Sequence, residues 1–312
     1  MIMASGTTDL YERLRGPKRL SMSPGGHGWL FLPPAFQQQR IQWMNRGVKA
    51  LRNGIGARPP VTIYWEPRPG LPPAGGWATQ RTRLRRFWLT SARTLSAAPP
   101  GNSPADERGL RDTYPTGVEL TGSNTEFAVP PDPNGSLTWT SAPFHGDFTI
   151  LGSVQLRFYA ASQNPDTDFE FVLQDVYPNG DVRFLQRGIL RASLRSIARS
   201  RSAPDHLVHA YRRAAYLIPG RIYESRLSLP PLGAVLRRGQ RLQLALLAPS
   251  PIPQPSWGLV PVDVPGQNTV HASVRYPCAI IVPMMADARA KRAPPPCGSM
   301  PLQPCRKPAH HR

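Results

Sequence analysis

The feature that most constrains the fold is a hairpin signal at Asn179-Gly180, near the middle of the chain. Asn-Gly between two alternating runs is the strongest short-range hairpin signal, because both residues of a two-residue turn take positive φ. Apolar residues alternate with polar ones over residues 150–160, 169–173 and 182–189, which is the period of a half-buried strand. Residues 148–194 therefore predict an antiparallel sheet, and they contain no obvious catalytic motif.

Further strand candidates extend this character from residue 59 onward, between loops rich in Pro, Gly, Ser, Asn and Asp. They are residues 61–65, 85–90, 117–120, 136–140, 223–229, 241–247 and 270–282. Many short strands with long crossing loops favour a mainly β fold, a sandwich of jelly-roll type over residues 59–285. The 38 prolines suit such loops better than a helical bundle.

Residues 1–58 have a different character. A short strand candidate at residues 18–22 leads into the Gly-rich turn Ser23–Gly28, which contains His27. Residues 34–51 then show helical spacing with an apolar stripe. A strand, a turn and a helix form an α/β fragment too short to bury a sheet, so the sequence predicts the last piece of a larger domain.

The charge of the chain is strongly basic but does not indicate nucleic-acid binding. There are 38 Lys and Arg against 19 Asp and Glu, and only four of the 38 are Lys, which leaves 34 Arg. The arginines are scattered, with short runs only at residues 81–86 and 237–241. A nucleic-acid binder is expected to show a clustered basic stripe or a known motif. We therefore predict no nucleic-acid partner.

The cysteines and the chain ends carry weak signals. Three cysteines do not make a disulfide framework: Cys278 is expected to be a buried thiol, and Cys297 and Cys305 could pair. Residues 286–312 are basic, Pro-rich and aperiodic, which predicts a disordered tail. No signal peptide or membrane span is indicated, so no membrane partner is expected and localisation stays open.

Several motifs occur together in a specific order and spacing. They are GGHG at residues 25–28, WMNR at 43–46, LGSV at 151–154, DTDF at 166–169, DVYPNG at 175–180, GILRA at 188–192, RGQRL at 238–242 and YPCAIIVP at 276–283. Over about residues 8–285 this combination resembles the cocaine esterase and X-Pro dipeptidyl-peptidase family of serine hydrolases.

The resemblance implies a C-terminal fragment of an α/β-hydrolase domain over residues 1–58, followed by a jelly-roll (galactose-binding-like) β-sandwich. It also implies hydrolysis of ester or X-Pro amide bonds through an acyl-enzyme, on a small ester or peptide and without a cofactor or metal. The family's Ser-Asp-His triad has its His last in chain order, and His27 stands at that position. An imidazole there would take the Ser proton and return it to the leaving group.

The nucleophile of such a triad is missing from the chain. No Gly-x-Ser-x-Gly elbow occurs in the 312 residues, and the nearest approach, GNSPA at residues 101–105, ends in Ala. Asp9 lies too close to His27 to match the usual triad acid. We therefore expect the C-terminal portion of a serine hydrolase that is inactive by itself. The alternative is a non-catalytic jelly-roll module that binds a ligand or a partner, and the oligomeric state is open.

Other chemistry has less support. Asp166, Asp168 and Asp175 lack the spacing of a Ca²⁺ loop. Glu170 and Asp175 could be paired glycosidase acids, but nothing in the sequence positions them across a cleft. We predict no metal site.

Overall fold

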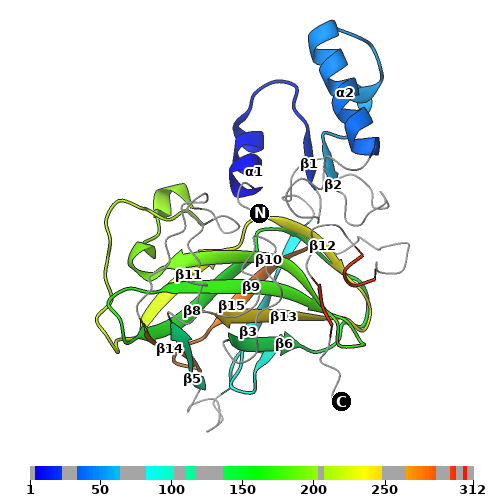
Figure 1. Ribbon diagram of the computed structural model, residues 1–312. Helices are drawn as coiled ribbons and strands as arrows, with labels where there is room; N and C mark the ends of the chain where they lie inside the picture. The colour runs from blue at the N-terminus through cyan, green and yellow to red at the C-terminus, as the bar shows by residue number, and fades with distance from the viewer. Residues whose placement is uncertain are drawn as a thin grey trace.

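The computed structural model describes residues 4–22, 34–63, 82–101, 110–116, 136–202, 207–247, 265–285, 296–299 and 305–307. It is mainly β, as the sequence predicts. Figure 1 shows a curled sheet with a small helical part to one side, at the top of the view.

The N-terminal part contains α1 (Ala4–Arg13), β1 (Leu20–Met22), α2 (Pro34–Lys49), a 3-10 turn (Ile55–Ala57) and β2 (Val61–Ile63). The remaining strands form one sheet. They are β3 (Thr82–Leu89), β4 (Thr94–Ser96), β5 (Leu110–Thr116), β6 (Ser136–Ser141), β7 (Phe148–Gly152), β8 (Gln155–Ser162), β9 (Asp168–Val176), β10 (Val182–Arg191), β11 (Tyr223–Ser228), β12 (Leu232–Leu236), β13 (Arg241–Leu247), β14 (Gly266–Ala272), β15 (Ala279–Met285) and β16 (Cys305–Arg306).

The sheet closes on its own core. Along it, β9 and β8 are separated by β13, β6, β4, β3 and β15, yet the Phe158 ring of β8 lies 5.0 Å from Phe169 and 4.8 Å from Phe171 of β9. The sheet therefore folds back until β8 faces β9. Trp139 is fully buried in the same core, because alternate residues of each strand point inward.

The predicted hairpin is present as β9–β10, but its turn differs from the expected one. The Tyr177 amide donates to the Asp181 carbonyl over 2.8 Å, so three residues form the loop. Among the loop residues Gly180 alone has a positive φ, of 84°. A three-residue loop needs one left-handed residue, where a two-residue turn needs two.

Two predicted strands are each divided in the structure. The run 150–160 breaks between β7 and β8, where Gly152 has a φ of 123° that only glycine adopts readily. The run 270–282 breaks between β14 and β15, where the Ser273 and Tyr276 backbones bond each other over 3.1 Å. The predicted strand 117–120 lies outside the described residues. Alternation identified the strands but not these interruptions.

Gly188 of β10 is a position where the core tolerates no side chain. A Cβ there would lie 2.8 Å from Cδ2 of Leu229, which is itself fully buried. We expect Gly188→Ala to lower the free energy of unfolding by about 1–3 kcal/mol through overpacking, measured by urea denaturation. Gly146→Ala is the control, since a Cβ at Gly146 meets nothing within 4 Å, and an equal loss in both variants would contradict the packing argument.

The N-terminal part packs on the sheet through a second, smaller core. Its members are Tyr11, Leu20, Met22, Val61, Leu151 and Val235. Within it β1 and β2 pair in parallel, with Leu20 opposite Val61. Among the described helices, none is long and apolar enough to cross a membrane.

Part of the predicted disordered tail is ordered. β16 pairs with Val182 and Arg183 of β10, and a disulfide joins Cys297 to Cys305. Lys307 adds an ion pair of 2.8 Å to Asp181. Backbone pairing at a sheet edge, a disulfide and an ion pair together hold residues 305–307, which composition alone does not indicate. The remaining boundaries of the tail stay a prediction.

Candidate functional site

The predicted catalytic residue, His27, lies in the segment 23–33, which is outside the described residues. The structure does describe both flanks of that segment. β1 ends at Met22, and α2 begins at Pro34. Because β1 and β2 are parallel and α2 lies between them in the chain, these elements form a β-α-β arrangement. The segment with His27 thus follows the carboxyl end of a parallel strand, where α/β sheets usually place their ligand sites.

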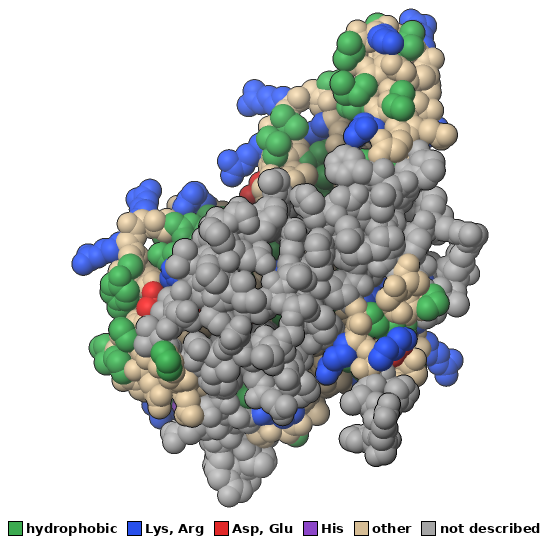
Figure 2. Space-filling view, viewed as in Figure 1, with side chains coloured by type: hydrophobic (Ala, Val, Ile, Leu, Met, Phe, Trp, Pro, Cys, Tyr) green, Lys and Arg blue, Asp and Glu red, His purple; other side chains and the backbone are tan. Residues whose placement is uncertain are grey.

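The helix that follows exposes the apolar stripe predicted for it. On α2, Ile41 is 55% exposed, Met44 56% and Val48 75%, at spacings that put them on one side of the helix. Figure 2 shows hydrophobic side chains, in green, at the surface of the protruding helical part at the upper right. An amphipathic helix normally buries its apolar stripe, so this face is typical of a surface that packs against further protein.

The carboxylates considered as metal ligands or glycosidase acids have structural partners. Among the described residues, no group of three or more His, Cys, Asp or Glu side chains could hold a metal ion. Glu170 and Asp175 are five residues apart on β9, so they point to opposite faces and cannot flank one cleft. The partners are Ser193 for Asp166, Arg191 for Asp168, Arg187 for Glu170 and Arg183 for Asp175.

The buried pair of Asp175 and Arg183 is the centre of a polar network inside the fold. The guanidinium of Arg183 donates to Oδ2 of Asp175 over 2.7 Å, and Gln240 Nε2 donates to the same oxygen over 3.1 Å. The amide oxygen of Gln240 accepts from the Arg237 backbone amide. Burial raises the pKa of Asp175 to about 6, although Arg183 acts to lower it. The network joins strand ends that are 65 residues apart in the sequence.

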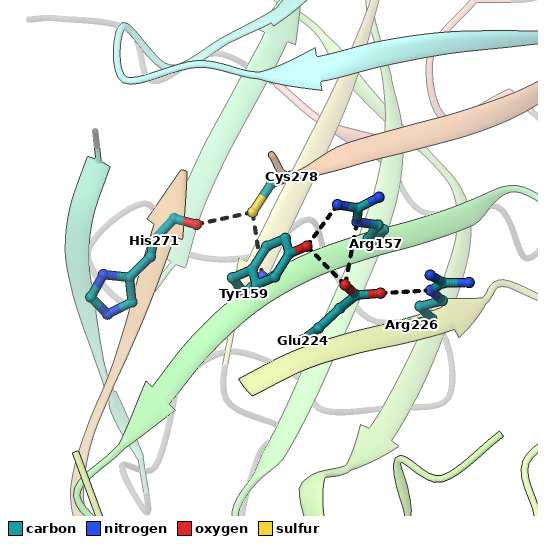
Figure 3. A network of polar contacts seen from close by, with 6 residues as sticks. All are labelled: Arg157, Tyr159, Glu224, Arg226, His271 and Cys278. Carbon is teal, nitrogen blue, oxygen red and sulfur yellow. Dashed lines mark hydrogen bonds and ion pairs between the residues drawn. The ribbon is translucent and has the colours of Figure 1, made fainter. Parts of the chain in front are cut away.

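A second network covers the outer side of the sheet (Figure 3). Tyr159 OH donates to Oε2 of Glu224 over 2.8 Å, and Arg226 Nε lies 2.8 Å from Oε1 of the same carboxylate. Arg157 donates to the Tyr159 hydroxyl over 2.6 Å. Glu224 thus has three partners, Tyr159, Arg157 and Arg226, which all lie on β8 and β11. Its negative charge is already paired within the sheet.

Cys278 adjoins that network at the backbone of Tyr159 and is confirmed as a buried thiol. Its sulfur accepts from the Tyr159 amide over 3.4 Å and donates to the His271 carbonyl over 3.1 Å. Burial raises the pKa of the Cys278 thiol to about 12, because the thiolate would be desolvated. Since a thiolate is the reactive form, Cys278 is unsuited to act as a nucleophile near neutral pH.

The described part of the chain thus consists of a large curled β-sheet joined to a small β-α-β unit. Residues 53–277 match the sequence model of the X-Pro dipeptidyl-peptidase C-terminal non-catalytic domain. The match spans more than half of the chain, and the chain therefore belongs to this family. The resemblance deduced from the motifs is confirmed at this level.

Curated relatives are longer proteins. Two of them, from Mycobacterium bovis and Mycobacterium tuberculosis, are 28% identical to this chain over 252 residues. Both carry names that describe them, by inference, as serine esterases. The alignment covers 73% of this chain and 40% of each relative. This chain thus spans less than half the length of the curated relatives that it matches.

Solved structures show the same fold. A CocE/NonD family hydrolase from Staphylococcus aureus superimposes with a TM-score of 0.74 at 14% identity, covering 90% of this chain and 51% of that one. An aminopeptidase from a marine sediment Thaumarchaeota archaeon gives 0.66 at 16% identity, covering 86% and 50%. An α-amino acid ester hydrolase gives 0.65 at 17% identity, covering 85% and 50%. At these identities the similarity establishes the fold alone.

Proposed function

We propose that this chain is the C-terminal portion of a serine hydrolase that cleaves ester or X-Pro amide bonds, with its nucleophile domain elsewhere. The observation that carries the proposal is the family match over residues 53–277, preceded by a β-α-β unit whose helix exposes an apolar stripe. A two-stranded sheet is too small to be stable alone, and the stripe of α2 needs a partner. The remainder of an α/β-hydrolase domain would supply both.

The proposed domain organisation follows from the same elements. Residues 1–58 would be the last strand and helices of the α/β-hydrolase domain, and residues 59–285 a jelly-roll (galactose-binding-like) sandwich. Residues 286–312 would form a tail that is disordered outside its disulfide-held part. The parallel β1–β2 pair supports an α/β unit at this end and would extend it slightly beyond residue 58, to the end of β2 at Ile63, because parallel strands belong to α/β units, whereas the large sheet is almost wholly antiparallel.

In this proposal His27 acts as the general base and then the general acid of the triad. It follows a parallel strand and precedes a helix, which is where a Gly-rich loop can bring an imidazole to a nucleophile from another segment. The sandwich would contribute to the shape of the acyl pocket without taking part in proton transfer. The substrate would be a small ester or peptide.

A fluorophosphonate probe tests the absence of the nucleophile. The 312-residue protein is expected to stay unlabelled and to leave p-nitrophenyl acetate hydrolysis at the buffer rate, because no serine lies on a nucleophile elbow. Intact-mass spectrometry measures the labelling, with a trypsin sample as the positive control. A stoichiometric covalent adduct would show that the nucleophile is present after all.

The second candidate function is a non-catalytic module that binds a ligand or partner, which is favoured by the family's description as non-catalytic. The reading frame upstream of Met1 separates the two candidates. An in-frame Gly-x-Ser-x-Gly followed by an Asp supports the hydrolase portion. A stop codon close to Met1 supports the binding module.

A further inference from the structure

A groove of about 1040 Å³ lies on the outer face of the sheet, away from the α/β unit. Strands β3, β15, β8 and β11 form its floor, and the segment from Arg195 to Ser202 forms one wall. Its volume is in the range of sites that bind small organic molecules. Neither the family description nor the proposed hydrolase function assigns a role to this groove.

The strand register gathers arginines on this face. Arg86 of β3 lies opposite Ile281 of β15, which in turn lies opposite Gln155 of β8. One step along, Arg157 of β8 lies opposite Arg226 of β11. Phe87 beside Arg86, and both strand neighbours of Arg157 and of Arg226, are buried, so these side chains face outward together. Arginines that are 140 residues apart in the sequence thus share one surface.

The wall of the groove adds two more arginines. The guanidinium of Arg195 donates to the carbonyl oxygens of Ala192 and Ala215 and lies 4.5 Å from the centre of the Tyr223 ring. Arg195 is therefore held in place before any ligand arrives. Arg199 is exposed on the short 3-10 turn that follows. Pre-organised donors reduce the entropy lost on binding.

The acid in the groove does not offset this charge. Glu224 is the one acidic residue among the described lining, and it is already bound by Arg226 at 2.8 Å and by Arg157 at 3.7 Å (Figure 3). In the described part of the chain, Arg86, Arg195 and Arg199 form no ion pair. No carboxylate therefore neutralises these three groups, although Arg195 also donates to two carbonyls and Arg86 lies 5.2 Å from the centre of the Trp88 ring.

Apolar side chains lie beside the unpaired arginines. Leu84 is 50% exposed two residues before Arg86, and Ile281, Ile197 and Leu207 also line the groove. An exposed leucine beside guanidinium groups provides a surface for an aliphatic chain next to a site for an oxyanion. A simple solvated basic face would not require such an apolar lining.

We propose that the groove binds an amphiphilic anion, meaning a carboxylate or phosphate head group on an aliphatic chain. The guanidinium groups of Arg86, Arg195 and Arg199 would bind the head group through charge-assisted hydrogen bonds, for which their fork geometry is suited. The aliphatic chain would lie along Leu84 and Ile281. The inference is independent of the hydrolase proposal, since none of these residues belongs to the α/β unit.

Isothermal titration of the full chain with decanoate, decyl phosphate, decanol and inorganic phosphate tests the proposal. Saturable binding is expected for decanoate or decyl phosphate, and the tighter of the two identifies the head group. Arg86→Gln and Arg199→Gln should each weaken that binding roughly tenfold or more, because each removes a charged hydrogen bond. Both side chains are exposed, so neither variant is expected to unfold.

The controls separate this site from general basicity. Arg238→Gln removes an exposed arginine outside the groove and should leave the affinity unchanged. Leu84→Ser should reduce the preference for decanoate over hexanoate. Decanol binding as tightly as decanoate, or the absence of any saturable binding, would overturn the proposal. So would tighter binding of an acidic peptide than of either amphiphile, since that would assign the groove to a protein partner.

Discussion

Replacing Arg183 by Met is expected to lower the free energy of unfolding by about 3–5 kcal/mol, because it leaves the buried carboxylate of Asp175 without its counter-ion. Asp175 is fully buried, and Arg183 is 5% exposed, so water cannot replace the lost partner. Gln240 would remain as a single neutral donor to the carboxylate. Urea denaturation with a common m-value measures the loss.

The loss should depend on pH in a direction that identifies its cause. Burial raises the pKa of Asp175 to about 6 in the fold, above its ordinary value of 3.8. Between these two pH values the folded state therefore binds more protons than the unfolded state. The contribution of Asp175 to the free energy of unfolding declines as the pH rises through this range to about 6. Without Arg183 the pKa of Asp175 rises further, so Arg183→Met should lower the free energy of unfolding more at pH 8 than at pH 5.

Two further variants make this test specific. Asp175→Asn on the Arg183→Met background should recover most of the loss at pH 8, since it removes the unpaired charge. Arg226→Met breaks an ion pair whose side chains are 50% and 36% exposed, and it should cost no more than about 1 kcal/mol. A loss for Arg183→Met that is independent of pH and is not recovered by Asp175→Asn would point to lost packing instead.

The second large effect concerns activity. If the upstream reading frame supplies the nucleophile, His27→Ala in the longer protein is expected to lower kcat/KM for a p-nitrophenyl ester by roughly ten-thousand-fold. The reason is that the nucleophile would lose its general base while substrate binding persists. Initial rates at fixed pH, together with fluorophosphonate labelling, measure the effect.

His145→Ala is the matched control for that experiment. His145 is exposed in the connection between β6 and β7, far along the chain from the β1–α2 segment, and its replacement should leave the rate unchanged. Equal losses in both variants, or a fully active His27→Ala protein, would remove His27 from the proposed triad. The labelling separates a misfolded protein from one that lacks its base.

The family motifs have mainly structural roles in the described residues. Asp166 of the DTDF motif bonds the Ser193 hydroxyl over 2.6 Å, and Thr167 accepts from Asn268 over 2.9 Å. Asp175 of the DVYPNG motif and Gln240 of the RGQRL motif bond each other inside the fold. The motifs in the described residues therefore hold distant segments of the chain together, whereas the GGHG motif contains the predicted catalytic residue, His27.

Alternation and turn residues in the sequence by themselves determined that the chain is mainly β, with a hairpin around Asn179-Gly180 and an amphipathic helix after a Gly-rich turn. These features depend on neighbours within a few residues, and the local pattern contains that information. Only the tertiary structure decided which strands lie side by side. Local patterns do not show that β3, β15, β8 and β11 are adjacent, or that Arg86 and Arg226 share one face as a result. The groove arises from that adjacency. The buried network needs a different long-range pairing, that of β13 with β9, which brings Gln240 to the Asp175–Arg183 pair of the β9–β10 hairpin.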